Sequence, residues 1–356
     1  MCGIDENGLG PYLGPLIITS VETQENKNDR KEENIREKNI REKSFINGEN
    51  FTKNRKDTEN RGKIKDSKAI FSRRKEDYEK IEKIFFSIFG KSGEINSAEI
   101  PPNTIFEVFA KSEFSKEIIE MCPISPEKIC FSKITIPLWM KKNENSTQNE
   151  SKKEERKSNK EGNKIMQEEG EEITLKKLKV RYAILCPGLL SKYIKIMGSK
   201  FSVNSYFMVK MALLSSSEKV ICGKSGFKKS YKNEIEKALQ DLKINYRKIK
   251  IEKEENEESI YEILEEREGK ERTLKKIYFI KDADEKFHEV ALASQIGKYI
   301  REICMLSLTK FLDEKSTFPI SGYGKKENMK KIAESIIQMA YSQKIKIPQE
   351  CIERNY

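Results

Sequence analysis

Histidine is almost absent from this chain of 356 residues, which contains only His288. A single histidine excludes a His-rich metal centre and gives little support for a Ser-His-Asp triad. Long apolar runs are also missing: no stretch reaches the roughly 18 residues that a membrane-spanning helix needs. With no signal peptide either, we expect a cytoplasmic protein without a membrane partner, acting as a monomer.

The chain also lacks paired cysteines. Its seven cysteines form no Cys-x-x-Cys motif, which favours free thiols in a reducing compartment over a disulfide framework. Most have apolar neighbours, so we expect buried thiols. A weaker alternative is a zinc site made by four of them: Cys122, Cys130, Cys186 and Cys222.

Apolar residues make up only 36% of the chain because three polar stretches are crowded with Lys, Glu, Asn and Arg: 22–63, 141–172 and 251–272. Such tracts bury too little apolar surface to repay the entropy of ordering. We interpret them as disordered, solvated insertions or exposed charged helices. Together they are net acidic, so the rest of the chain is more basic than the overall charge of +11. This excess favours a partner with a phosphate backbone.

The periodicity of apolar residues predicts an α/β fold. Strands are expected in 1–21, 129–131, 134–136, 180–185, 220–222 and 277–280. Helices are expected over 73–90, 201–214, 286–312 and 325–343.

The N-terminal segment joins two adjacent carboxylates to a glycine-rich turn: Gly-Ile-Asp-Glu-Asn-Gly-Leu-Gly-Pro, residues 3–11. Neighbouring strand residues face opposite ways, so Asp5 and Glu6 can share a metal ion only if the strand breaks right after Asp5. Asn7-Gly8 and Gly10-Pro11 are turn-forming pairs that could supply the break. Such a combination is typical of a metal-dependent phosphodiesterase.

The motif resembles the opening of type 2 ribonucleases H, the ribonuclease HII and HIII enzymes. Three further segments match that family in order: Lys65-Asp66-Ser67-Lys68, the stretch from Ala283 to Arg301, and Ser321-Gly322-Tyr323-Gly324. The resemblance implies a ribonuclease H-like mixed β-sheet flanked by helices, in one domain that the polar stretches interrupt, with a helical C-terminal part over 286–356. It also implies that acidic side chains from the chain's start and its last third converge in one catalytic site.

By the resemblance, Asp5, Glu6 and Asp284 occupy three of the family's four acidic positions. Carboxylate oxygens favour Mg²⁺ or Mn²⁺, and two such ions serve phosphodiester hydrolysis. The fourth position departs from the family, because Cys222 or Gly223 stands where an Asp is expected. Asp282 would lie on the same side as Asp284 in an extended chain, and we predict that it replaces the missing ligand.

The resemblance also implies substrate contacts. The backbone N–H groups of Gly8, Leu9 and Gly10 would meet a ribose 2′-OH and a phosphate, although ribonuclease HII has Arg at the position of Leu9. Tyr323 matches the tyrosine that packs on the sugar beside the scissile ribonucleotide. Ser67 is expected to bind the substrate, and the expected phosphate-binding residues are Lys68, Lys298 and Arg301, the last two sharing a helix face.

The expected activity is hydrolysis of the RNA strand of RNA–DNA hybrids, or cleavage 5′ of a ribonucleotide embedded in duplex DNA. The products would carry 3′-hydroxyl and 5′-phosphate ends. Because one acidic position is altered, the alternative is a hybrid-binding protein with impaired catalysis. A purely structural protein is the third alternative, which predicts no salt-dependent affinity for nucleic acid.

Overall fold

The computed structural model describes residues 1–23, 73–89, 102–140 and 178–354. Within them the centre of the molecule is a mixed β-sheet of seven strands in the order β3-β2-β1-β4-β7-β6-β5. β1 runs parallel to β4, β4 runs parallel to β7, and the other neighbours are antiparallel. The strands are β1 (Cys2–Asn7), β2 (Leu16–Thr23), β3 (Leu178–Leu185), β4 (Lys219–Gly223), β5 (Lys248–Glu254), β6 (Glu258–Arg267) and β7 (Lys270–Ile280).

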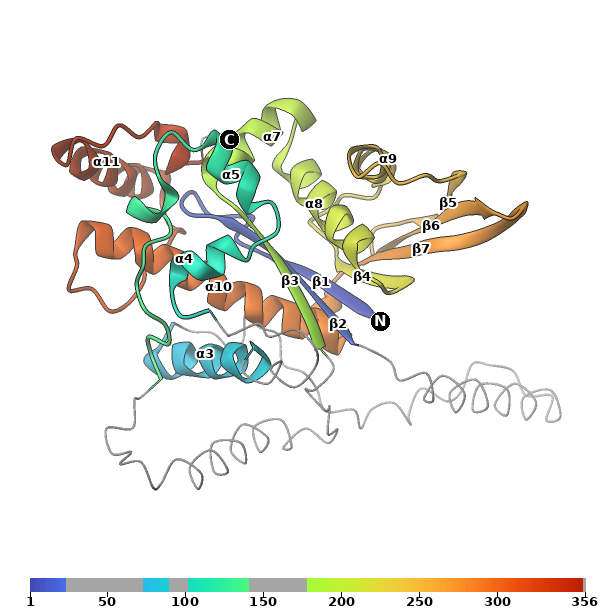
Figure 1. Ribbon diagram of the computed structural model, residues 1–356, viewed down its shortest axis with the longest axis horizontal. Helices are drawn as coiled ribbons and strands as arrows, with labels where there is room; N and C mark the ends of the chain where they lie inside the picture. The colour runs from blue at the N-terminus through green and yellow to red at the C-terminus, as the bar shows by residue number, and fades with distance from the viewer. Residues whose placement is uncertain (24–72, 90–101, 141–177, 355–356) are drawn as a thin grey trace, which may run out of the picture.

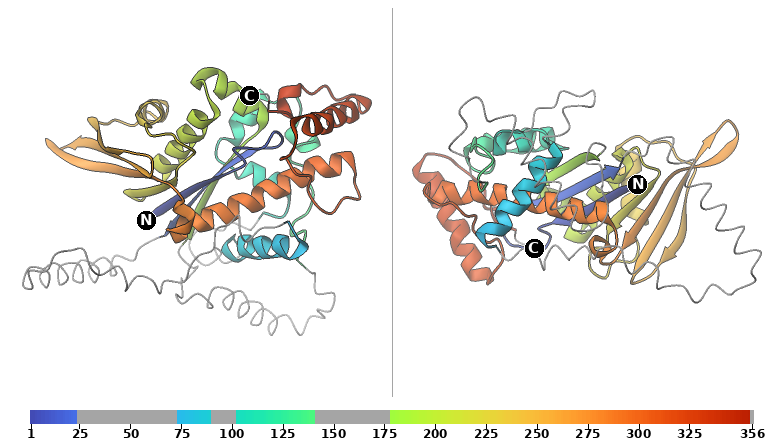
Figure 2. Two further views of the ribbon diagram at one scale, coloured as in Figure 1. Left: turned by 180° about the vertical axis from the view of Figure 1, so that it is seen from behind. Right: turned by 90° about the horizontal axis from the view of Figure 1, so that it is seen from below.

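Helices cover both faces of the sheet (Figure 1). α10 lies along β1 and β2 with α3 packed against it, whereas α8 covers the opposite face and contacts α7 and α9. The right-hand view of Figure 2 shows α3 and α10 together on one side of the strands. The helices are α3 (Lys75–Phe89), α4 (Ile105–Ala110), α5 (Ser115–Met121), α7 (Pro187–Met197), α8 (Lys200–Leu214), α9 (Lys232–Asp241), α10 (His288–Leu312) and α11 (Lys326–Ser342).

The predicted mixed sheet flanked by helices, with a helical C-terminal part, is confirmed. Short 3-10 turns complete it: η2 (Pro126–Lys128), η4 (Ala283–Glu285) and η5 (Gln349–Cys351). Among the described residues, no helix has both the length and the apolar character required to span a membrane.

Two sequence predictions about secondary structure are wrong. Residues 251–272, interpreted as a polar insertion, form most of the β5–β6–β7 meander. Ser259, Tyr261 and Ile263 stand at every second position and are fully buried, so one face of β6 joins the core despite the acidic composition of the strand. The expected strands at 129–131 and 134–136 are absent: the first region is turn, and Thr135 makes only an isolated bridge with Thr104. The other two insertions, 22–63 and 141–172, lie almost wholly outside the described residues.

Two glycines allow α10 to lie very close to β1. A Cβ on Gly3 would collide with the Val290 backbone nitrogen, and a Cβ on Gly297 would lie 2.7 Å from Nδ2 of Asn7. Any side chain at either position would therefore push the helix off the strand. This contact fixes where the end of β1 lies relative to the start of α10.

Glu82 of α3 connects three parts of the chain through hydrogen bonds. Its fully buried carboxylate accepts hydrogen bonds from the backbone N–H groups of Leu138, Trp139 and Met140 at 2.6–2.7 Å, and from the Tyr299 hydroxyl at 3.0 Å. A buried acceptor with four donors leaves several of them unsatisfied when it is removed.

Glu82→Gln should lower the free energy of unfolding by about 3 kcal/mol, because an amide offers one acceptor oxygen and brings unwanted N–H donors. Urea denaturation measures the change. The matched control on the same helix is Glu79→Gln, whose carboxylate only pairs with Lys75 at 3.9 Å and should cost less than about 1 kcal/mol. Equal midpoints for the two variants would contradict this role of Glu82.

Candidate active site

The acidic residues predicted near the start and in the last third of the chain line one pocket. It lies where the carboxyl ends of the parallel strands β1, β4 and β7 meet, and its cavity volume is about 310 Å³. Parallel neighbours end at the same edge of a sheet, which explains why residues so distant in sequence converge. The lining residues are Asp5, Glu6, Asn7, Gly8, Leu9, Gly10, Gly223, Lys224, Asp282, Ala283, Asp284, Ser294, Lys298 and Tyr323.

Asp5 and Glu6 both reach the position beside Gly223 at the end of β4. A Cβ built on Gly223 would lie 2.7 Å from Oδ1 of Asp5 and 3.8 Å from Oε2 of Glu6. Cys222 instead is fully buried in the hydrophobic core. Of the two candidates for the altered acidic position, Gly223 is therefore the one that faces the carboxylates.

The strand does not break after Asp5 as the sequence suggested. β1 continues through Glu6 to Asn7, and the backbone leaves strand geometry only at Gly8, whose φ is +92°. The longer side chain of Glu6 nevertheless brings its carboxylate near that of Asp5. Asn7 anchors the strand end, because its Nδ2 donates to the Ser294 carbonyl oxygen on α10 at 2.9 Å.

Asp282 and Asp284 enter the pocket from the other side, in the turn between β7 and α10. This turn is not extended, which corrects the expected geometry: Asp282 is left-handed at φ 52°, and Asp284 lies in η4. Aspartate tolerates this conformation better than most residues. Asp282 is exposed and Asp284 half-buried, and both line the pocket although their spacing no longer places them on one side.

The donor set fits a hard divalent cation, since carboxylate oxygens are the ligands that Mg²⁺ and Mn²⁺ favour. In the described part of the chain, however, no three acidic, histidine or cysteine side chains already form a metal-holding group. The four carboxylates line one cavity, and their side chains would have to turn toward a common point to hold an ion. This result also gives no support to a zinc site at Cys122, Cys130, Cys186 and Cys222, all of which are described.

Lys224 is a pocket residue that the sequence analysis missed. Its Nζ donates to Oγ of Ser259 at 2.8 Å and to the Glu255 carbonyl oxygen. Burial lowers the pKa of Lys224 below the usual lysine value. The feature of the sequence that could have indicated Lys224 is its position directly after a strand that ends at the same edge of the sheet as β1. A lysine here can offset the negative charge of a phosphate.

Lys298 and Tyr323 lie where the sequence analysis expected substrate contacts. Lys298, on α10, is half-buried and lines the pocket. Tyr323 is 53% exposed, and its Cε1 lies 3.5 Å from the position of a Cβ on Gly10. The ring therefore lies beside the glycine-rich loop of residues 8–14. The expected contacts Ser67 and Lys68 lie outside the described residues.

Arg301, expected as a phosphate contact, does not lie on the surface. Its side chain is only 3% exposed and lies beneath the glycine-rich loop. Nη2 donates to the Leu13 carbonyl oxygen at 3.4 Å, and Nη1 pairs with Glu302 at 3.4 Å. Its Cζ lies 5.4 Å from the centre of the Tyr323 ring, within cation–π range. Arg301 lies three residues after Lys298, and this spacing alone did not reveal that the glycine-rich loop packs over this turn of α10.

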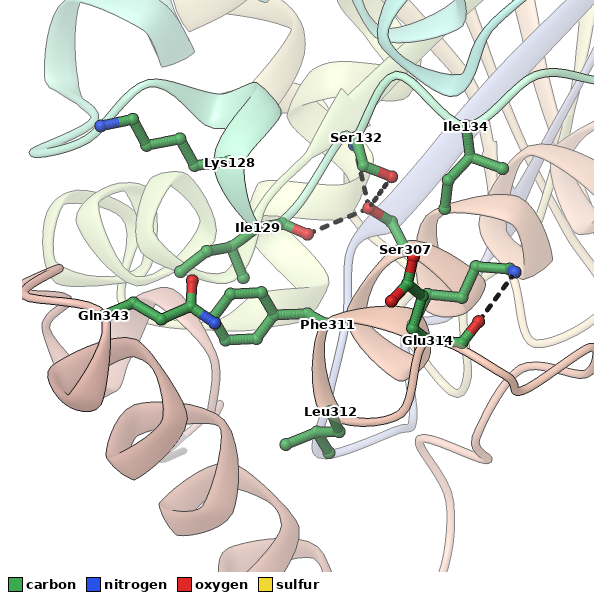
Figure 3. Close-up of a pocket in the computed structure, with 10 residues that line it drawn as sticks. Lys128, Ile129, Ser132, Ile134, Ser307, Phe311, Leu312, Glu314 and Gln343 are labelled. Atoms are coloured by element: carbon green, nitrogen blue, oxygen red, sulfur yellow. Dashed lines mark hydrogen bonds between the residues drawn. The ribbon is translucent and has the colours of Figure 1, made fainter.

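A second cavity of about 510 Å³ lies near the far end of α10 (Figure 3). Several of its polar groups bond to one another: the Ser307 hydroxyl donates to the Ile129 carbonyl oxygen, and Lys310 donates to that of Glu314. Glu314 is its only acidic lining residue. A larger volume without converging carboxylates makes it a poorer candidate for phosphodiester chemistry than the pocket at the strand ends.

Comparison with known proteins supports the family resemblance. Residues 201–347 match the family model of ribonuclease HII. This range contains Gly223, Asp284 and Tyr323 but not the N-terminal motif. No curated protein matches the chain.

Three solved structures are similar at low identity. The PCNA:RNase HII complex from Archaeoglobus fulgidus has a TM-score of 0.36 at 11% identity, over 100% of this chain and 94% of that one. Bst-RNase HIII in complex with Mn²⁺ gives 0.34 at 11%, over 99% and 65% of the two chains. A mutant form of Bst-RNase HIII gives 0.35 at 10%, with the same coverages. This chain thus spans about two thirds of the HIII chains. The ribonuclease HII match over 201–347, together with the ordered motifs, supports a resemblance of this chain to the type 2 ribonucleases H.

Proposed function

We propose that this protein is a metal-dependent endonuclease that hydrolyses the RNA strand of RNA–DNA hybrids or cuts 5′ of a ribonucleotide embedded in duplex DNA. The observation that carries the proposal is the single pocket shared by Asp5, Glu6 and Asp284, the glycine-rich loop and Tyr323. Acidic ligands, exposed peptide groups and an aromatic ring are what cleavage next to a ribose requires.

The roles follow from position. Asp5, Glu6 and Asp284 would hold two divalent ions, Mg²⁺ or Mn²⁺, with Asp282 as a fourth ligand. Bound ions would supply the activated water and stabilise the leaving oxygen. Lys224 and Lys298 approach the same pocket and would neutralise phosphate charge. The loop at Gly8, Leu9 and Gly10 would recognise the ribose.

Tyr323 would pack on the neighbouring sugar. Its half-exposed ring lies beside Gly10 and is backed by the buried guanidinium of Arg301. A ring supported on one side and open on the other can stack on a nucleotide without rearrangement. We assign Arg301 to holding this ring and the loop instead of to phosphate binding. Monomeric action and a cytoplasmic location stay predictions.

The direct test is a cleavage assay on two labelled duplexes, a full hybrid and a DNA duplex with one ribonucleotide. We expect products with 3′-hydroxyl and 5′-phosphate ends in Mg²⁺ or Mn²⁺, and none in a chelator. A duplex of DNA alone should stay intact. No cleavage of either ribonucleotide-containing substrate in both metals would contradict the proposal.

A second candidate function rests on Gly223. With no carboxylate at this position, the chain could bind hybrids without cutting them. Salt-dependent affinity for a hybrid without products in either metal would select this binding function.

Asp282→Asn tests whether Asp282 replaces the missing ligand. If it does, cleavage should fall about as far as in Asp5→Asn, because the second ion loses a charged ligand. Asparagine also tolerates the left-handed backbone of this residue, so the turn should be kept. Glu285→Gln, in the same turn but outside the pocket lining, is the matched control and should retain activity. Unchanged cleavage by Asp282→Asn would discard the replacement.

A further inference from the structure

The glycine-rich loop is held from beneath by the last described residues of the chain. The Arg354 backbone N–H donates to the Tyr12 carbonyl oxygen at 2.9 Å, and Glu353 forms an antiparallel bridge with Leu13. Arg354 is only 1% exposed and ranks among the largest fully buried side chains. Burying a guanidinium is costly unless its donors are satisfied.

The donors of Arg354 are satisfied by carbonyl groups of this loop. Nη1 donates to the Gly8 oxygen and, at 3.4 Å, to the Pro11 oxygen. Nε donates to the Gly14 oxygen at 2.8 Å, and Nη2 donates to the same oxygen. One planar group thus fixes three carbonyls between the end of β1 and the start of β2, as its fork of donors permits.

The direction of the Gly8 carbonyl determines the direction of the next N–H group. In a trans peptide, C=O of one residue and N–H of the next point to opposite sides. Because the Gly8 oxygen points at Arg354, the Leu9 N–H points away from it. Leu9 and Gly10 line the pocket. A cation on the carbonyl side also polarises the peptide, which strengthens its N–H as a donor.

The loop cannot easily turn over, because a second buried arginine confines it. A Cβ on Gly8 would lie 2.6 Å from Nε of Arg301, and Arg301 also bonds the Leu13 oxygen. Two guanidinium groups therefore approach Gly8. Of these two, Arg354 is the one that bonds the Gly8 carbonyl itself.

We propose that Arg354 is a positioning residue that directs the Leu9 N–H toward the 2′-OH or phosphate of a bound ribonucleotide. The inference rests on the proposed function and adds a residue outside the matched motifs. It also explains how the site can work with Leu9 in place of an arginine, since the contact comes from the peptide and not from the side chain.

The test compares binding of an RNA–DNA hybrid and of the same sequence as DNA, by fluorescence anisotropy in Ca²⁺ at one salt concentration. The wild type should bind the hybrid more tightly, and R354Q should lower this preference by about threefold to tenfold, the worth of one hydrogen bond. R354K keeps the charge but lacks the fork, so it should lie between the two. R181Q, which removes a partly buried arginine paired with Glu22 and Glu113, should keep the wild-type preference.

The ratio of the affinity for the hybrid to that for DNA distinguishes a positioning role of Arg354 from a role in stability alone. A loss of folded protein lowers the affinity for both duplexes alike and leaves their ratio unchanged. A wild-type ratio in folded R354Q would overturn the inference alone, and if R354Q fails to fold, a wild-type ratio in R354K would do so. A wild-type protein that binds both duplexes equally would overturn the proposed function together with the inference.

Discussion

Asp5→Asn should reduce cleavage of an RNA–DNA hybrid by about a thousandfold or more in either Mg²⁺ or Mn²⁺. Asp5 lies near the end of β1, and its carboxylate is the group nearest to the Gly223 position, where Glu6 also reaches. An asparagine keeps the shape but removes the charge that holds a divalent ion. Single-turnover rates measured against metal concentration give the effect.

A measurement of hybrid binding distinguishes this loss of cleavage from misfolding of the variant. Hybrid affinity should change only a few-fold, because the lysines, the loop and Tyr323 are untouched. Asp313→Asn is the matched control, since that carboxylate bonds Lys315 and Ser316 after the end of α10 and lies outside the pocket lining. A folded Asp5→Asn protein that keeps more than a tenth of wild-type activity would remove Asp5 from the catalytic residues.

Gly223→Asp should add a carboxylate at the altered acidic position and raise the affinity for Mn²⁺ by about tenfold, or about 1.4 kcal/mol. Gly223 lies in β4 with no left-handed backbone angle, so aspartate suits its conformation. The new Cβ would approach Oδ1 of Asp5 at 2.7 Å, and the far end of that side chain can rotate away. Without metal, the added negative charge should lower the melting temperature; with Mn²⁺ it should raise it beyond the wild type.

Two variants make this result specific. Gly223→Asn has nearly the same volume without the charge, and it should show no gain in metal affinity. In the Asp282→Asn background, Gly223→Asp should recover part of the lost cleavage if the two positions supply the same ligand. Equal metal responses in Gly223→Asp and Gly223→Asn would mean that this position does not face a cation site.

Much of the fold could be predicted from apolar periodicity. The helix expected at 201–214 is α8 (Lys200–Leu214), and the one expected at 325–343 is α11 (Lys326–Ser342). Strands β1, β2, β3, β4 and β7 also lie where the sequence predicted strands. These elements are rich in buried apolar residues, so their pattern is visible without knowledge of their partners.

The β5–β6 pair could not be predicted in the same way. Charge dominates 251–272, yet many of these charges pair across strands, as Lys250 does with Glu262 and Lys253 with Glu258. Tyr261, Ile263 and Leu264 are the buried apolar residues of β6, and Ser259 is buried beside them. Cross-strand ion pairing lets a sheet edge consist mostly of Lys and Glu, a composition that also characterises disordered segments.

The acidic residues of the site could be predicted from the sequence, but the residues that hold the glycine-rich loop in place could not. Motifs placed Asp5, Glu6, Asp282 and Asp284, and the structure gathers all four around one pocket. The roles of Arg301 and Arg354 depend on which carbonyls the folded loop turns inward, and a sequence carries no local signal for that. Lys224 was missed because its hydrogen-bond partners, Ser259 of β6 and Glu255, come from a segment whose structure was not foreseen.

The most direct test of the central claim is an anomalous-scattering map from crystals soaked in Mn²⁺. The account predicts Mn²⁺ peaks between the carboxylates of Asp5, Glu6 and Asp284, with a second ion reached by Asp282. Well-ordered carboxylates without a peak between them, at Mn²⁺ concentrations that support cleavage, would contradict it.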